Sequence, residues 1–310
     1  MAEEAEQSGR RFVRRVAHAK VNLALAVSAP IDDDSELDGM HPIASWMAPI
    51  DLADELLVTR LEDDRLSRYA ILWHDEAPQK SAAIDWSVRD DLAVRAHLLL
   101  ERQMGRTLPV QMKLDKRIPV GGGLGGGSSD AAAMLLAVRE LFELSLSDDD
   151  LRKLAIELGS DVPFFLQTRE DRSGVGPAPA VIEGLGEKCT PVKPVHPDSA
   201  HLVLVLPEFG CPTGRVYRAF DQAVTSVEGD SDHVFRDVEV HKLASKRVVR
   251  ADELFNDLGA PAQEVQPKLT AVMSNIERAI GTMPLVKPVH PDSAHLVLVL
   301  PEFGCPTGRV

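Results

Sequence analysis

Six glycines in seven residues constrain this chain more than any other feature of its sequence. The run Gly121–Gly127 reads GGGLGGG and is followed directly by Ser128 and Ser129. Glycine tolerates positive φ and has no Cβ, so its backbone can approach a ligand closely. Because a strand is predicted before the run, at Val110–Leu114, and a helix after it, at Ser128–Leu141, successive amides and a helix N-terminus can face an anion. The pattern predicts a phosphate-binding loop and argues against a flexible linker.

Two better-known phosphate loops do not fit this run. A P-loop ends in Gly-Lys-Ser/Thr, whereas the last glycine here precedes Ser128-Ser129-Asp130. A dinucleotide GxGxxG can be read within the glycines, but any glycine run matches it. Its acidic partner, expected about 20 residues later, would fall on a predicted helix instead of a strand. The loop is therefore predicted to hold the phosphates of ATP without a lysine of its own, and the serine hydroxyls can serve a phosphate or Mg²⁺.

The overall charge excludes several classes of partner. The formal net charge is −14 over 310 residues, and a field of this sign repels a polyphosphate chain, so we expect neither nucleic-acid nor anionic-membrane binding. The basic cluster at 10–15 is interpreted as a solvated strand edge. The three cysteines, Cys189, Cys211 and Cys305, lack CxxC spacing, which predicts a reducing compartment and no metal site of protein ligands. With an acidic N-terminus and no apolar run of about 20 residues, a cytoplasmic location is expected.

Strand and helix patterns alternate along the rest of the chain. Ser147 and Asp150 have the spacing of a capping box, for a helix that runs to Leu158 before Gly159. The Gly- and Pro-rich stretch Asp171–Pro179 predicts a boundary between domains at 1–175 and 176–310. The other predicted elements are a strand at Arg14–Val27, a polar loop at Ile31–Pro42 and a helix at Asp90–Gln103.

An exact repeat stands out in the second half. Residues 192–216 and 286–310 share the sequence VKPVHPDSAHLVLVLPEFGCPTGRV. Natural repeats drift and need several adjoining copies to bury a core, so this pair is interpreted as a recent duplication or an artefact. The apolar segment His201–Leu206 predicts a buried central strand. Its copy, His295–Leu300, cannot occupy the same position, so we expect it to replace a terminal strand or to pack loosely at an edge.

Several motifs together resemble the GHMP kinase superfamily. They are the glycine loop, AHAKVNLAL at Ala17–Leu25, DGMH at Asp38–His41, GSDVPFF at Gly159–Phe165 and EGLGE at Glu183–Glu187. Within the superfamily, the chain is most similar to the kinases of 4-diphosphocytidyl-2-C-methyl-D-erythritol in the non-mevalonate route to isoprenoids. The resemblance implies an α+β fold of two domains, the first like ribosomal protein S5 domain 2 and the second ferredoxin-like. It also implies ATP-dependent phosphorylation of the substrate's 2-hydroxyl, Mg²⁺ as cofactor and a monomer or homodimer.

The same resemblance assigns roles to single residues. Lys20 and Asp161 match the catalytic pair, in which Asp161 would accept or orient the hydroxyl proton and Lys20 would offset phosphoryl charge. Asn22 and His41 match contacts to the cytidine half of the substrate, and Tyr217 matches a ring that stacks on cytosine. The residues implied for ATP binding are Pro119, Gly121, Gly122, Gly123, Leu124, Gly125, Gly126, Gly127, Ser128 and Ser129. The element Asn256-Asp257-Leu258 is interpreted as structural.

Three positions depart from the family pattern. Met40 replaces an aromatic residue on the other face of the cytosine, which should weaken stacking but keep apolar contact. His18 replaces a proline. After Ile280 the pattern calls for a second glycine-rich element of the Ser-Gly-Ser-Gly type, and the duplicated segment occupies that place. Two alternatives therefore stay open: another GHMP kinase, acting on homoserine, mevalonate or a sugar, or a nucleotide-binding protein without catalysis.

Overall fold

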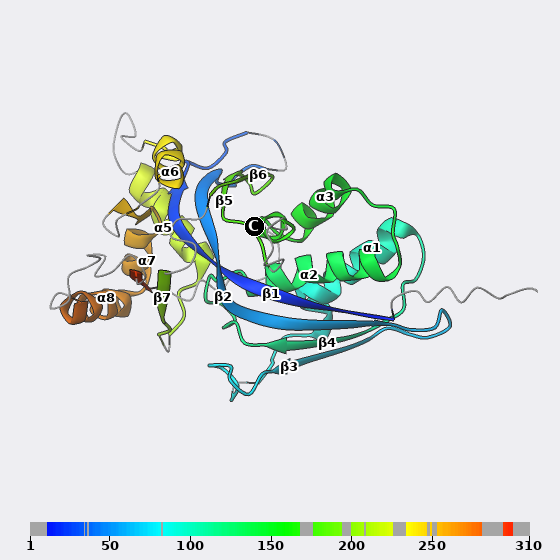
Figure 1. Cartoon of the computed structure of the whole chain (residues 1–310). Coiled ribbons are helices and arrows are strands. Elements are labelled where there is room, and N and C mark those ends of the chain that lie inside the picture. Colours follow the sequence, from blue (N-terminus) through cyan, green and yellow to red (C-terminus); the bar gives the residue numbers. More distant parts are fainter. Residues whose placement is uncertain are drawn as a thin grey trace, which may run out of the picture. The chain divides into compact units, whose positions relative to one another are not determined.

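Two compact units make up the structure of this chain (Figure 1). The computed structural model describes residues 11–33, 35, 37–81, 83–167, 176–193, 200–207, 209–225, 234–246, 249, 253–280 and 294–299. Unit 1 consists of residues 1–19, 50–119 and 125–177, and unit 2 of residues 20–49, 120–124 and 178–310. The two longest strands, β1 (Phe12–Val27) and β2 (Ile43–Arg60), contribute residues to both units. The predicted boundary stretch lies partly outside the described residues.

A sheet of β1, β2, β3 (Arg68–Trp73) and β4 (Val110–Lys116) forms one layer of unit 1. Strand β4 pairs antiparallel with β2 and parallel with β3. Its side chains alternate, so that Val110, Met112 and Leu114 are buried, as expected for a strand with one face on the core. The predicted strands at Arg14–Val27 and Val110–Leu114 are confirmed, and each is two residues longer than predicted.

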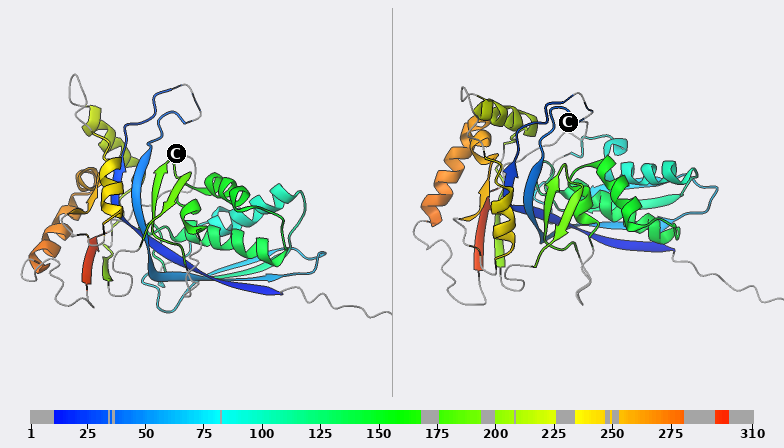
Figure 2. Two further views of the ribbon diagram at one scale, coloured as in Figure 1. Left: turned by 45° about the horizontal axis from the view of Figure 1, so that its top comes forward. Right: turned by 90° about the horizontal axis from the view of Figure 1, so that it is seen from above.

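Helices cover one face of this sheet (Figures 1 and 2). They are the 3-10 helix η1 (Val88–Asp90), α1 (Leu92–Met104), α2 (Gly126–Leu141), α3 (Asp148–Leu158) and α4 (Val162–Phe165). The predicted helix at Asp90–Gln103 starts later, because the Asp91 carboxylate accepts the Ala93 N–H at 3.0 Å and caps α1 there. The capping box of Ser147 and Asp150 is confirmed, and α3 ends before Gly159 as predicted.

Unit 2 contains the remaining halves of β1 and β2, to which shorter elements are added. Its strands and helices are β5 (Ala180–Gly184), β6 (Lys188–Pro191), β7 (Ala200–Val205), α5 (Thr213–Thr225), α6 (Asp237–Ala244), β8 (Phe255–Asn256), α7 (Gly259–Val265), α8 (Pro267–Ile280) and β9 (Ala294–Val299). Strand β5 pairs antiparallel with β2 and β6, and β8 pairs parallel with β1. The predicted α+β class is confirmed. Among the helices of the described ranges, none is long and apolar enough to cross a bilayer.

The end of β1 lies between two apolar clusters of unit 2. Ala24 and Ala26 pack with Trp46 and the buried side of α6, whereas Leu25 and Val27 pack with α5, α7 and α8. The Asp257 carboxylate accepts the Val27 N–H at 2.9 Å, and the Asp257 N–H donates to the Leu25 carbonyl at 3.0 Å. The structural role predicted for Asn256-Asp257-Leu258 therefore has a physical basis, since this turn holds the end of β1.

The duplicated segment differs from its prediction. Strand β7 pairs parallel and in register with its own copy, β9, from Ala200↔Ala294 to Val205↔Val299 (Figure 2). In the described part of the chain these two strands form a separate two-stranded sheet, and Val203 is 48% exposed. The prediction of a buried central strand is therefore wrong. The backbone register pairs each residue of β7 with the same residue of its copy.

Candidate active site

Every second residue through the middle of the glycine loop has a left-handed backbone. Gly121, Gly123 and Gly125 have φ of 80°, 67° and 70°, in the region where a Cβ is strongly disfavoured. Gly122 and Leu124, between them, do not have positive φ. Backbones in which left-handed residues alternate with others can turn successive N–H groups toward one concave side.

The last two glycines of the loop serve close packing instead. A Cβ on Gly126 would lie 2.9 Å from Ile118 Cγ2, and a Cβ on Gly127 would lie 3.3 Å from Leu92 Cδ1. Both residues belong to the first turn of α2, which begins at Gly126, two residues before the predicted start. The missing side chains let the start of this helix approach the residues that precede the loop.

The N-cap residue of α2 is Gly125. It has no side chain to accept a backbone N–H, as Asp91 and Ser147 do at the starts of α1 and α3. Ser128 is half-buried, whereas Ser129 is only 3% exposed. The backbone N–H groups in the first turn of this sixteen-residue helix can therefore donate to an anion. Of the two predicted serines, Ser128 is the better placed to offer its hydroxyl.

Three buried charges frame the loop. Lys116, the last residue of β4, is 3% exposed, and its Nζ lies 2.7 Å from Asp54 Oδ2 and 2.5 Å from Asp130 Oδ2. Asp54 and Asp130 are 0% and 1% exposed. Burial alone would lower the pKa of Lys116, but the two carboxylates raise it above its ordinary value. Burial raises the pKa of Asp130, and Lys116 opposes that rise. Because its charge is already matched, Lys116 is not the phosphate cation that the loop lacks.

Lys20 and Asn22 are brought together on the unit 2 half of β1. The ammonium of Lys20 donates to Asn22 Oδ1 at 2.6 Å, and the Asn22 amide donates to Ser45 Oγ at 2.7 Å. Ser45 in turn donates to the Ala24 carbonyl at 3.0 Å. The backbone N–H of Lys20 donates to the carbonyl of Leu124 in the glycine loop, at 2.8 Å. A predicted catalytic residue is thus hydrogen-bonded to the predicted phosphate loop.

Asp161 belongs to unit 1 and takes the N-cap position of α4. Its carboxylate makes no capping hydrogen bond to that helix, and the residue is half-buried. The four residues after it, Val162–Phe165, are all buried, and the two phenylalanine rings meet edge to face at 5.0 Å. A buried apolar turn therefore fixes the backbone at Asp161 while its carboxylate is not used as a cap.

His41 follows a tight turn that depends on Gly39. The Gly39 N–H donates to the Ile31 carbonyl, and the Ile31 N–H donates to the Met40 carbonyl, both at 2.8 Å. Gly39 has a φ of 77°, which explains the glycine in DGMH. His41 Nδ1 lies 3.0 Å from the Ser28 carbonyl, and Nε2 lies 3.2 Å from Asp221 Oδ1. The imidazole is therefore held from both sides, and Asp221 is a contact that the sequence did not predict.

Tyr217 lies against His41, with ring centroids 5.0 Å apart and planes tilted by 39°. Its neighbour on α5, Phe220, meets the same imidazole edge to face at 5.9 Å. Tyr217 is half-buried and also packs against the core formed by Leu25, Val27 and α7. Two of the three residues predicted to bind the cytidine half, His41 and Tyr217, are thus neighbours, and the tyrosine touches both the core and the imidazole.

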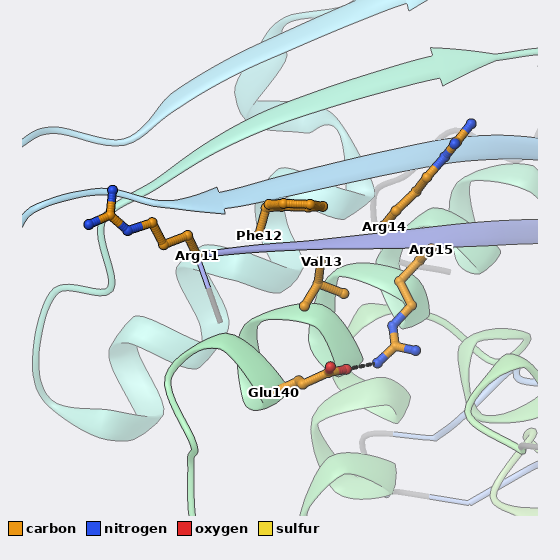
Figure 3. Close-up of a pocket in the computed structure, with 6 residues that line it drawn as sticks. All are labelled: Arg11, Phe12, Val13, Arg14, Arg15 and Glu140. Atoms are coloured by element: carbon orange, nitrogen blue, oxygen red, sulfur yellow. Dashed lines mark hydrogen bonds and ion pairs between the residues drawn. The ribbon is translucent and has the colours of Figure 1, made fainter. Parts of the chain in front are cut away.

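A surface hollow lies elsewhere, along the start of β1 (Figure 3). It is lined by Arg11, Phe12, Val13, Arg14, Arg15 and Glu140. Arg15 pairs with Glu140, and Arg14 pairs with Glu55, so that the Arg14 guanidinium holds the pKa of the Glu55 carboxyl below its ordinary value. Paired and exposed arginines agree with the predicted solvated strand edge, and none of the predicted site residues lines this hollow.

The buried charges are the feature that the sequence reasoning missed. A signal was present, because Lys116 continues the alternation of Val110, Met112 and Leu114 and so falls on the buried face of β4. Asp54 falls in the same way on the face of Leu56 and Val58. A charged residue in phase with an apolar face predicts a buried ion pair, but nothing in the pattern says which residues pair.

The family described as "GHMP kinases N terminal domain" matches residues 91–169, from the cap of α1 to just beyond α4 and including the glycine loop. The class that the fold and the loop define is the GHMP kinases.

Individual relatives identify a family within this class. The 4-diphosphocytidyl-2-C-methyl-D-erythritol kinase of Symbiobacterium thermophilum is 38% identical over 205 residues, which are 66% of this chain and 63% of that relative, just under two thirds of its length. The enzyme of that name from Desulfitobacterium hafniense is 31% identical over 275 residues, 88% of this chain and 83% of that relative. A crystal structure of 4-(cytidine 5'-diphospho)-2C-methyl-D-erythritol kinase matches with a TM-score of 0.55 and 32% identity, covering 87% of this chain and 84% of that one. The chain belongs to the 4-diphosphocytidyl-2-C-methyl-D-erythritol kinase family.

Proposed function

We propose that this chain transfers the γ-phosphoryl group of ATP to the 2-hydroxyl of 4-diphosphocytidyl-2-C-methyl-D-erythritol. The observation that carries the proposal is the glycine loop, in which left-handed Gly121, Gly123 and Gly125 lead into an uncapped helix. Relatives and a solved structure that bear the name of this activity support the choice of substrate.

On the nucleotide side, the loop residues Pro119 to Ser128 would hold the phosphates. Backbone N–H groups and the start of α2 supply partial positive charge there. Mg²⁺, when bound with ATP, would offset phosphate charge, and the half-buried Ser128 hydroxyl is an oxygen donor that fits it. Ser129 is more deeply buried, so we assign it to the support of the helix.

Lys20 and Asp161 would perform the transfer. Asp161 accepts the proton of the substrate hydroxyl while the hydroxyl oxygen forms its bond to the γ-phosphorus of ATP. The bond between that phosphorus and the ADP leaving group breaks in the same step. Lys20 stabilises charge on the transferred group. One feature supports the role of Lys20: its backbone N–H is hydrogen-bonded to the carbonyl of Leu124 in the loop.

The cytidine half of the substrate would bind near Asn22, His41 and Tyr217. Tyr217 offers a half-buried ring beside the His41 imidazole, and an aromatic ring is the usual surface for a base. Met40, half-buried on the turn before His41, would give a softer apolar contact on the other face.

The test is turnover of ATP with 4-diphosphocytidyl-2-C-methyl-D-erythritol, compared with homoserine, mevalonate and a sugar. We expect the first substrate to be preferred, and Asp161→Asn to lower kcat by roughly 10²–10⁴ with ATP affinity little changed. Lys20→Ala should also reduce turnover more than stability. The matched control is Asp149→Asn, which removes an exposed carboxylate of the same unit. Near-normal kcat for Asp161→Asn would show that Asp161 is not catalytic. A preference for another acceptor would show that the proposed substrate is wrong.

A second candidate function is nucleotide binding with little or no turnover. It is favoured by the segment 286–310, which repeats 192–216 where the family pattern calls for a further glycine-rich element. The described part of that segment, β9, pairs with β7. We expect replacement of 286–310 by a Ser-Gly-Ser-Gly tail to restore or raise turnover. Equal rates with and without the replacement would show that the tail does not matter.

A further inference from the structure

The frame of the glycine loop is a buried network of one lysine and two aspartates. All three side chains are 3% exposed or less, although charged side chains are rarely buried without a specific pairing. Removing two carboxylates and an ammonium from water is costly. The network therefore needs an explanation beyond ordinary surface pairing.

Its members stand at the two ends of the loop. Lys116 ends β4, four residues before Val120, and Asp130 is the fifth residue of α2. Asp54, on β2, also accepts the backbone N–H groups of Arg117 at 2.5 Å and Ile118 at 2.8 Å. The Asp54 carboxylate thus fixes the residues before the loop. The Lys116 ammonium connects Asp54 to Asp130, on the helix α2 that follows the loop.

The hold on α2 depends on Lys116. Asp130 Oδ2 accepts from Lys116 Nζ at 2.5 Å, whereas Asp130 Oδ1 has no hydrogen-bond partner among the residues that the structure describes. The neighbouring Asp91 carboxylate is also buried and repels Asp130. Without the ammonium, the carboxylates of Asp54, Asp91 and Asp130 would repel one another in a dry interior.

The loop between these ends cannot hold its own shape. Six of its seven residues are glycine, which visits left- and right-handed conformations with similar ease and loses the most backbone entropy when ordered. A phosphate cradle gains affinity when it is formed before the ligand arrives. The backbone of the loop must therefore be fixed from outside.

We propose that Lys116, bound between Asp54 and Asp130, is the positioning residue that holds the glycine loop in its nucleotide-binding shape. The proposal rests on the ATP-dependent function proposed above. Lys116 acts through the backbone at both ends of the loop and does not itself touch the nucleotide in this role. Its loss should therefore weaken ATP binding specifically, while binding of the second substrate changes little.

The first test uses a variant that removes all three charges of the network: Lys116→Met combined with Asp54→Asn and Asp130→Asn. The matched control is Lys113→Met, on the same strand but with an exposed ammonium paired to Asp115. We expect the triple variant to keep the circular dichroism spectrum of the wild type and to raise KM for ATP at least tenfold. KM for the acceptor should change less than twofold, and Lys113→Met should match the wild type. An unchanged KM for ATP in the folded triple variant overturns the proposal.

A second measurement needs no variant. Backbone 15N relaxation of the nucleotide-free wild type should give order parameters for 120–128 close to those in the middle of α2. Order parameters typical of a flexible segment would overturn the proposal even if the triple variant failed to fold. The proposed function fails separately, if the wild type binds no ATP, whatever the order parameters of the loop.

Discussion

The glycine loop and the His41–Tyr217 cluster are both named by sequence motifs, but the structure holds them in different ways. The loop is framed by buried charges, with Lys116 3% and Asp54 0% exposed. His41 is held by half-buried neighbours, a ring tilted by 39° and an Asp221 side chain that is 34% exposed. The first arrangement is specified by a few strong contacts, and the second by several weak ones.

This difference has consequences for substitution. Removing one partner of a buried ion pair leaves an uncompensated charge, which costs about 3–5 kcal/mol. Contacts between rings, such as that of His41 with Tyr217, contribute about 0.5–1.5 kcal/mol beyond the area they bury. Nucleotide binding should therefore fail sharply when the loop frame is damaged, whereas recognition of the second substrate should decline by degrees.

The largest expected effect is that of Lys116→Met alone. This change leaves the carboxylates of Asp54 and Asp130 buried without their cation, so the free energy of unfolding should fall by about 3–5 kcal/mol. Urea denaturation followed by circular dichroism measures it. Lys113→Met should cost less than about 1 kcal/mol, because exposed pairs contribute little. Similar losses for both lysines would mean that burial does not strengthen the ion pairs of Lys116.

The intermediate effect tests the aromatic cluster. Tyr217→Ala should raise KM for the cytidine substrate by about one to two decades, since stacking of a base on a ring contributes roughly 1–3 kcal/mol. Tyr217→Phe keeps the ring and should be nearly silent. Steady-state kinetics with saturating ATP gives both values. If Tyr217→Ala lowers stability but leaves KM unchanged, the tyrosine serves only the core against which it packs.

The smallest effects come from two glycines near the starts of two helices, one in each region. Gly126→Ala should lower stability by about 1–2 kcal/mol, because its Cβ would lie 2.9 Å from Ile118 Cγ2. Gly214→Ala, in α5 beside Tyr217, meets no atom within 4 Å and should raise stability by about 0.4–1 kcal/mol. Thermal unfolding compares them. A gain in stability for Gly126→Ala would mean that the loop does not need its close packing.

The sequence was sufficient for local features. The strand at β1, the capping box of Ser147 and Asp150 and the left-handed glycines follow from side-chain alternation, from capping chemistry and from backbone freedom. Each depends on residues close together in the chain. The predicted start of α2 was two residues late, because glycine is a poor helix former and Gly126 and Gly127 were therefore assigned to the loop.

Contacts between distant residues were decided by the tertiary structure. Lys116 finds Asp54, 62 residues away, and His41 finds Asp221 on a helix of the second half of the chain. For β7, a sequence suited to a buried strand found an identical partner instead of a larger sheet. The pattern of one segment predicts which face is buried and which backbone conformations are possible. It does not predict the partner, because that depends on which side chains the fold brings within a few ångströms. At such distances, burial strengthens the attraction between opposite charges.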